Sequence, residues 1–173
     1  SPMGDYIASK GLKKGEIHPV YKAMNLLNYD AATVGNHEFN YGLEFMNTAL
    51  AGANFPYVNA NVIDKATGKP YFTPYLIKDY QFTDDKGEQQ AMKIGYIGFV
   101  PPQILTWDKK HLDGKLEVKD ITKTARALIP QMKAEGADII IALMHSGLSK
   151  EEYQPSAENS VAYISKIDGI DAI

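Results

Sequence analysis

One apolar run, residues 137–144, constrains the fold of this chain more than any other feature of its sequence. It contains three successive isoleucines, Ile139 to Ile141, and it follows Gly136, a residue that commonly ends helices. A short and nearly continuous apolar run is typical of a strand that is buried on both faces of a parallel sheet. The run therefore favours an α/β fold, in which a mixed sheet is flanked by helices.

Helical and extended patterns alternate along the rest of the chain. Helices are predicted over residues 18–28, with Val20, Met24 and Leu27 on one face, and from Asn40 to Gly52. Further helices are predicted from Asp120 to Gly136, with a kink at Pro130, and over 157–166. Strands are predicted over residues 31–34, 57–61, 75–82 and 91–100, the last two as a hairpin, and from Asp171 onward. Residues 101–119, which begin with two prolines, are predicted to form a long surface loop.

Composition narrows the classes of function. The chain has 173 residues, of which 45% are hydrophobic, enough for one domain with a core. A net charge of −3 provides no basic field for a nucleic-acid polymer, although metal ions can supply positive charge for a small phosphate ester. The absence of cysteine excludes disulfides, thiolate metal ligands and a cysteine nucleophile. No stretch reaches the roughly 18 apolar residues of a membrane span.

Two polar clusters follow predicted strands. Gly35-Asn36-His37-Glu38 comes directly after residues 31–34, and His145-Ser146-Gly147 comes directly after residues 137–144. Ligands of open α/β sheets bind at the carboxyl ends of the strands, so both clusters are expected at one site. Imidazole nitrogen and amide oxygen are both good ligands for divalent metals. The two clusters therefore predict a metal site at the edge of the sheet.

Each of these residues also has an ordinary structural interpretation. A single histidine at a strand end is more often a surface or capping residue, and a single asparagine is equally typical of a turn. His18 is interpreted as a helix-start residue and His111 as a loop residue. The glutamates near the clusters are interpreted as solvated charges: Glu38, Glu44, Glu151 and Glu152. The sequence has no Walker-type loop, no Gly-x-Ser-x-Gly elbow and no His-Glu-x-x-His helix.

Taken together, the motifs resemble those of a known family. Residues 34–42, VGNHEFNYG, resemble the Gly-Asn-His-Asp/Glu signature of calcineurin-like metallophosphoesterases, in the form of the 5′-nucleotidase branch. Residues 142–147 resemble the later histidine motif of that branch, and residues 59–62 lie where the branch has a similar stretch. Order and spacing agree along essentially the whole chain. Residues 39–42 and 1–6 resemble in particular the bacterial 2′,3′-cyclic-nucleotide 2′-phosphodiesterase/3′-nucleotidases.

The resemblance implies roles for four residues. Asn36 and His145 would ligate one metal of a two-metal centre, with zinc, manganese, cobalt and magnesium all open as the metal. His37 and Asn40 would form the catalytic pair, in which His37 faces the scissile phosphate and protonates the leaving oxygen. Many family members carry Asp at the position of Asn40. An amide still accepts a hydrogen bond there, but it supplies no charge to stabilise the imidazolium.

The resemblance also implies that residues 1–173 are a partial catalytic domain, incomplete at both ends. The family's other metal-binding motifs would lie before residue 1 and after Ile173, and its C-terminal nucleotide-binding domain is absent. The isolated chain is therefore expected to be inactive, and its longer parent is expected to be a periplasmic or exported hydrolase of small nucleotides. Two alternatives remain open: a 5′-nucleotidase or nucleotide-sugar hydrolase, against which Asn40 argues, and a non-catalytic phosphoesterase-like binding module.

Overall fold

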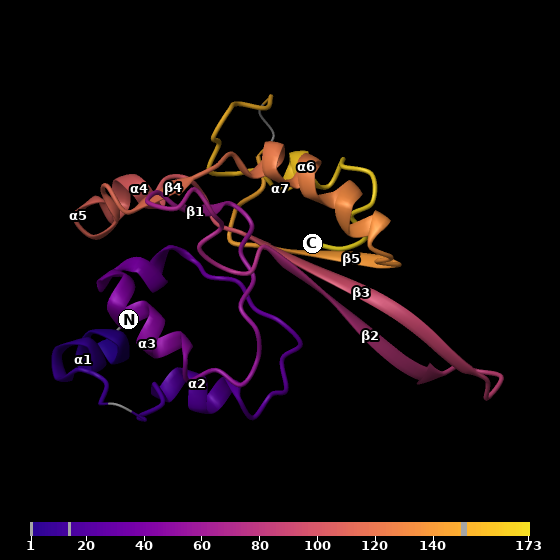
Figure 1. The fold of residues 1–173 in the computed structure, drawn as a ribbon, viewed down its shortest axis with the longest axis horizontal. Helices are drawn as coiled ribbons and strands as arrows, with labels where there is room; N and C mark the ends of the chain where they lie inside the picture. Colours follow the sequence, from indigo (N-terminus) through magenta and orange to yellow (C-terminus); the bar gives the residue numbers. More distant parts are fainter. Residues whose placement is uncertain (1, 14, 150–151) are drawn as a thin grey trace.

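The computed structural model describes residues 2–13, 15–149 and 152–173. Its helices are α1 (Pro2–Lys10), α2 (Pro19–Met24), the 3-10 helix η1 (Asn36–Phe39), α3 (Gly42–Leu50), α4 (Ile104–Trp107), α5 (Lys109–Leu112), α6 (Ile121–Ala134) and α7 (Val161–Ile164). Its strands are β1 (Val62–Asp64), β2 (Tyr75–Thr83), β3 (Gln89–Phe99), β4 (Leu116–Val118) and β5 (Ile139–Met144). Figure 1 shows α1 to α3 gathered on one side of the molecule and the β2–β3 hairpin projecting from the other.

The main sheet has the order β2-β3-β5 and is mixed, as the sequence predicts. The hairpin is confirmed, since β2 and β3 pair antiparallel around residues 84–88, while β3 and β5 pair parallel from Ile94↔Ile139 to Phe99↔Met144. Ala172 forms a parallel bridge with Ile141, which confirms the extended segment from Asp171. These pairings place the carboxyl ends of β3 and β5 side by side.

The prediction that 137–144 is buried on both faces is wrong for one face. Ile140 and Ala142 are fully buried against α6 and α7, whereas Ile139 and Ile141 on the other face are only half-buried. Successive side chains of a strand point to opposite faces, and these two helices cover only the first of them (Figure 1).

Helix α6 begins where the sequence predicts. Asp120 is its N-cap, and its Oδ1 accepts a hydrogen bond of 2.7 Å from the backbone N–H of Lys123. Four of its apolar residues are buried in the core under the sheet: Ile121, Ala125, Ile129 and Met132. Pro130 lies inside the helix. The amphipathic pattern thus fixes which face of α6 supports the main sheet.

The prediction of a surface loop over residues 101–119 is wrong. This segment contains α4, α5 and β4, and Ile104 and Leu112 are fully buried in a second core with α3 and β1. Pro101 and Pro102 are compatible with this structure because proline is tolerated where a helix starts. The carbonyl of Pro101 accepts a hydrogen bond from Ile104 N at the beginning of α4.

Helix α2 is shorter than predicted, and only Met24 of the three apolar residues on the predicted face packs against a buried cluster. Tyr21 is buried, whereas Val20 and Leu27 are 46% and 65% exposed. The helix ends at Met24 because the Asn25 side chain ties the chain to the loop after α3, donating to Gly52 O at 2.9 Å and accepting from Asn54 N at 2.9 Å. Leu27 therefore lies beyond the helix.

The interpretation of His18 as a helix-start residue is confirmed. It is the N-cap of α2, and its Nδ1 accepts a hydrogen bond of 3.2 Å from Val20 N. Burial lowers the pKa of His18, which favours the neutral ring that such an acceptor requires. The interpretation of His111 as a loop residue is wrong, because it lies in α5 with its ring against Gly42.

Three other predicted elements are shorter or differ in their caps. The strand over 31–34 is a single parallel bridge between Ala32 and Tyr57, the helix over 157–166 is α7 alone, and α3 starts after Tyr41 rather than at Asn40. In the segment 57–61, the buried Asn59 side chain accepts hydrogen bonds from two following backbone N–H groups. Local bonds of this kind compete with strand pairing.

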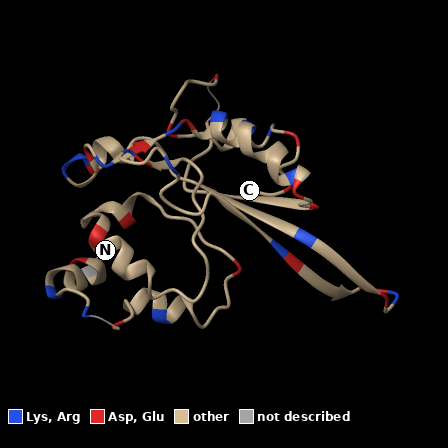
Figure 2. Ribbon diagram, viewed as in Figure 1, with Lys and Arg blue, Asp and Glu red and all other residues tan. Residues whose placement is uncertain are grey.

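Within the described ranges, no helix is long and apolar enough to cross a membrane. Lys and Arg are spread over several helices and the hairpin and are interspersed with Asp and Glu, as Figure 2 shows. The expectation that the chain does not bind a nucleic-acid polymer stays a prediction.

Candidate active site at the sheet edge

The two predicted metal ligands meet at the carboxyl end of the main sheet. His145 follows β5, and its backbone N–H donates to Phe99 O at 3.0 Å, which continues the ladder between β3 and β5 by one residue. Asn36 opens η1, 109 residues earlier in the chain, yet its Oδ1 lies 2.8 Å from Nε2 of His145. The ring of His145 is exposed and Asn36 is half-buried. The structure thus brings together an imidazole nitrogen and an amide oxygen.

Gly35 leaves the space in which this contact forms. Its backbone is extended, with φ −101°, so no unusual backbone angle requires glycine. A Cβ at this position would lie 2.8 Å from Nδ1 and 2.9 Å from Cε1 of His145. Glu38 holds the turn from the other side, because its Oε2 accepts a hydrogen bond of 2.6 Å from Gly35 N. The interpretation of Glu38 as a solvated charge is therefore wrong, and that of Glu151 lies outside the described residues.

We expect Gly35→Ala to displace His145 from Asn36 and to weaken metal binding about 10-fold or more, the range seen when the support of a ligand is lost. Broadening of the His145 ring resonances by added Mn²⁺ would measure this. The variant should need a higher Mn²⁺ concentration for the same broadening, at an unchanged thermal unfolding midpoint. Equal broadening in both proteins would show that the position of His145 does not depend on this space.

A cavity of about 320 Å³ opens beside the contact. It is lined by Asn36, Pro101, Trp107, Met144, His145, Ser146, Gly147 and Glu158. The loop that follows β5 is anchored here, since Ser146 Oγ donates to Glu158 O at 2.6 Å and accepts from Ser160 N at 2.8 Å. The volume is within the range of small-molecule sites. This cavity is the part of the surface where a small ligand can reach both predicted metal ligands.

The predicted catalytic pair is also in contact. Nδ1 of His37 lies 2.8 Å from Oδ1 of Asn40, and the amide nitrogen of Asn40 donates to Oδ1 of Asp108 at 2.9 Å. Asp108 is only 4% exposed and lies between α4 and α5. Sequence reasoning missed Asp108 because its segment was predicted to be a surface loop. No local signal in the sequence places it beside a residue 68 positions earlier.

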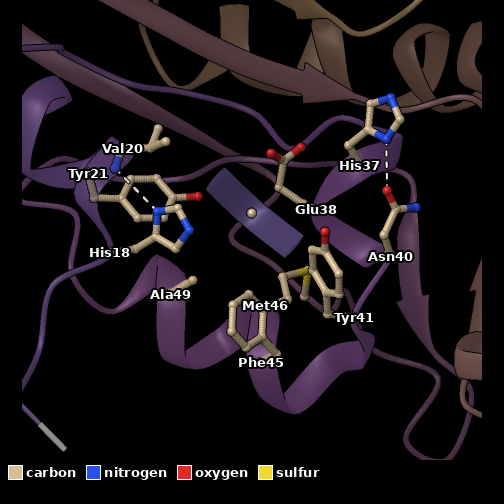
Figure 3. A pocket seen from close by; sticks show the side chains of 11 residues that line it. His18, Val20, Tyr21, His37, Glu38, Asn40, Tyr41, Phe45, Met46 and Ala49 are labelled. Atoms are coloured by element: carbon tan, nitrogen blue, oxygen red, sulfur yellow. Dashed lines mark hydrogen bonds between the residues drawn. The ribbon is translucent and has the colours of Figure 1, made fainter. Parts of the chain in front are cut away.

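Figure 3 shows the second cavity, of about 140 Å³, on which His37 and Asn40 lie. Its other walls are largely aromatic and apolar, with Tyr21, Tyr41 and Phe45 among them. Burial raises the pKa of Tyr21, and the hydrogen bond that Tyr41 donates to the Asp5 carboxylate raises the pKa of Tyr41. Both phenols therefore remain neutral at physiological pH.

The four predicted residues thus form two contacting pairs that line two different cavities. Helix η1 carries one member of each pair, Asn36 and His37, as consecutive residues. The amide oxygen of Asn36 and Nε2 of His145 converge and have the donor types that divalent cations accept. Among the described residues, no group of three or more His, Cys, Asp or Glu side chains lies close enough to hold a metal. The pair therefore fits part of the coordination shell of one ion.

Comparison with known proteins identifies the family to which the chain belongs. No family model matches the chain. The crystal structure of the calcineurin-like phosphoesterase YfkN from Bacillus subtilis superimposes with a TM-score of 0.95 at 48% identity, covering 100% of this chain and 53% of that one. The chain belongs to the calcineurin-like phosphoesterase family, with the α/β fold of mixed sheet and flanking helices that the sequence predicts.

Several relatives of the chain share one name with each other. The 2′,3′-cyclic-nucleotide 2′-phosphodiesterase/3′-nucleotidase of Salmonella typhimurium is 60% identical over 173 residues, which are 100% of this chain and 27% of the relative. The enzyme of the same name from Yersinia enterocolitica is 59% identical over 173 residues, 26% of its length. The chain thus spans about a quarter of the length of these curated relatives.

Proposed function

We propose that this chain forms part of the catalytic domain of a two-metal hydrolase that acts on 2′,3′-cyclic nucleotides and 3′-nucleotides. The observation that carries the proposal is the 2.8 Å contact between Asn36 Oδ1 and His145 Nε2 at the sheet edge. The names of the similar proteins support the substrate class. A nucleotide-binding domain would lie in the remaining length of such a protein, which would be periplasmic or exported.

In this proposal, Asn36 and His145 hold one of two divalent ions, with zinc, manganese, cobalt or magnesium as candidates. When bound, the ions would supply Lewis-acid chemistry at this edge of the sheet, namely polarisation of the phosphoryl group and activation of water. Because the space around His145 is fixed by Gly35 and β5, its ring already lies against Asn36. Nε2 would have to lose the proton that it donates to Asn36 Oδ1 before it could ligate an ion.

His37 supplies the proton. Its Nδ1 is occupied by Asn40 Oδ1, which leaves Nε2 as the nitrogen that faces a substrate. A protonated Nε2 donates to the ester oxygen as the P–O bond breaks. In the cyclic substrate this oxygen is the ribose 2′-oxygen, and in the 3′-nucleotide it is the 3′-oxygen. One imidazole thus serves both hydrolytic steps, in which a water molecule adds to phosphorus and the sugar hydroxyl departs.

We expect the 173-residue chain alone to show negligible hydrolysis of bis-p-nitrophenyl phosphate and weak metal binding. The reason is that two ligand side chains cannot complete a two-metal site. A chimera, in which this chain replaces the matching segment of the Salmonella typhimurium relative, should bind about two divalent ions and hydrolyse 2′,3′-cyclic nucleotides. Fast turnover by the chain alone, or a folded chimera without metal and activity, would refute the proposal.

A further inference from the structure

Asp108 is a buried acidic residue whose side chain forms an unexpected hydrogen bond. It occupies the N-cap position of α5, where Asp normally accepts a hydrogen bond from its own helix, yet its side chain makes no capping bond. Instead, its Oδ1 accepts the amide hydrogen of Asn40, and Oδ2 has no hydrogen-bond partner among the described residues. Burying a carboxylate in this way is costly, and the side chain gives up its local partner for Asn40.

The contact fixes which way the Asn40 amide points. A carboxylate only accepts hydrogen bonds, so the amide group that faces Asp108 must be the NH₂. The oxygen of Asn40 then faces His37, and since this oxygen also only accepts, Nδ1 of His37 must carry a proton. Without Asp108 the two ends of the amide would be nearly equivalent in shape, and either could face the ring.

We infer that Asp108 is a positioning residue that sets the tautomer of His37 through Asn40. A carboxylate at position 40 would contact His37 directly and orient its ring. Asp108 has the same effect indirectly, because it orients the Asn40 amide that contacts the ring. With the amide reversed, its NH₂ would oppose the Nδ1 proton, and a neutral ring would place its proton on Nε2 and its lone pair on Nδ1. The inference rests on the proposed function of His37 only where it concerns turnover.

The test changes which of the two residues, 40 or 108, donates the hydrogen bond that joins them. In D108N both amides can flip, so the direction of the bonds is no longer fixed. In N40D two carboxylates face one another and repel. In the double variant N40D/D108N, the carboxylate now at position 40 again accepts from Nδ1 of His37, and the amide now at position 108 donates to that carboxylate. The bond to His37 thus keeps its original direction, while the bond between positions 40 and 108 is reversed. The double variant keeps one amide and one carboxylate in the pair, so its volume and charge are unchanged.

The first readout is the tautomer of His37 in the 173-residue chain without metal, from its ¹⁵N ring shifts at about pH 8, above the usual histidine pKa. Loss of the signal in His37→Gln assigns it. We expect the proton on Nδ1 in the original chain and in the double variant, and a mixture of both tautomers in D108N. An Nε2–H ring in the original chain, or an unchanged ring in D108N, would overturn the inference.

The second readout is kcat of the chimera with 2′,3′-cyclic nucleotide. We expect D108N and N40D each to lose about 10-fold and the double variant to recover most of the loss, since supporting residues have effects of this size. Loss in D108N without a change of tautomer, or no recovery in the double variant, would assign Asp108 a merely structural role. If D108N does not fold, the double variant decides by the same two criteria. An inactive chimera with the expected tautomers would defeat the proposed function and leave the inference standing.

Discussion

Replacing His37 with alanine in the chimera should lower kcat for 2′,3′-cyclic nucleotides by about 10²–10⁴-fold, the usual contribution of a positioned general acid. The bound metal should remain, because His37 contacts Asn40 and lines a cavity other than the one beside His145. Metal analysis of the purified variant, together with its initial rates, measures both effects. The leaving group offers a further check, since an ester with a good leaving group needs less protonation and should lose less.

His145→Ala is the matched variant, because it removes the same ring from the other pair. Here we expect loss of metal first, with turnover falling as a consequence, since the alanine removes one of the two ligands that this chain supplies. Excess Mn²⁺ should restore part of the activity of His145→Ala and none of that of His37→Ala. If both variants lost metal equally, the division between a metal-binding pair and an acid pair would be wrong.

The sequence predicts at which edge of the sheet the polar residues gather, because both polar clusters directly follow predicted strands. The apolar run that ends at Met144 fixes the place of His145, and the parallel pairing of β5 with β3 is the pairing that such a run favours. The contact between Asn36 and His145 is consistent with the expected common site. Their roles as metal ligands, and those of His37 and Asn40, stay predictions.

The sequence does not predict the contacts, between residues far apart in the chain, that hold these side chains in place. Asp108 reaches Asn40 only because α5 packs against α3, and residues 101–119 carry too weak a period to show their helices. Asn59 and Asn61 are another example. They belong to a stretch that resembles the family, yet both are fully buried, and the Asn61 amide donates to Val100 O and Lys119 O. A motif can therefore be structural, and only packing shows it.

Gly98→Ala should destabilise the chain by about 3 kcal/mol, the upper end of the range for overpacking. Gly98 lies in β3, where the segment of Val58 crosses the strand so closely that Gly98 O accepts a hydrogen bond of 2.8 Å from Ala60 N. A Cβ on Gly98 would lie 2.1 Å from Val58 O and 2.5 Å from Thr33 Oγ1. A backbone carbonyl cannot rotate away as a side chain can, so the crossing segment must shift as a whole.

The control lies three residues earlier in the same strand. A Cβ on Gly95 would meet Met132 Cε at 2.6 Å, but this is the end of a flexible side chain, so Gly95→Ala should cost only about 1 kcal/mol. Urea unfolding of both variants gives the comparison. Thr33 is two residues before Gly35, so Gly98→Ala should also disturb the His145 ring resonances, whereas Gly95→Ala should not. Equal destabilisation by the two variants would mean that the crossing at Gly98 can relax, and the sheet edge would then not depend on this close approach.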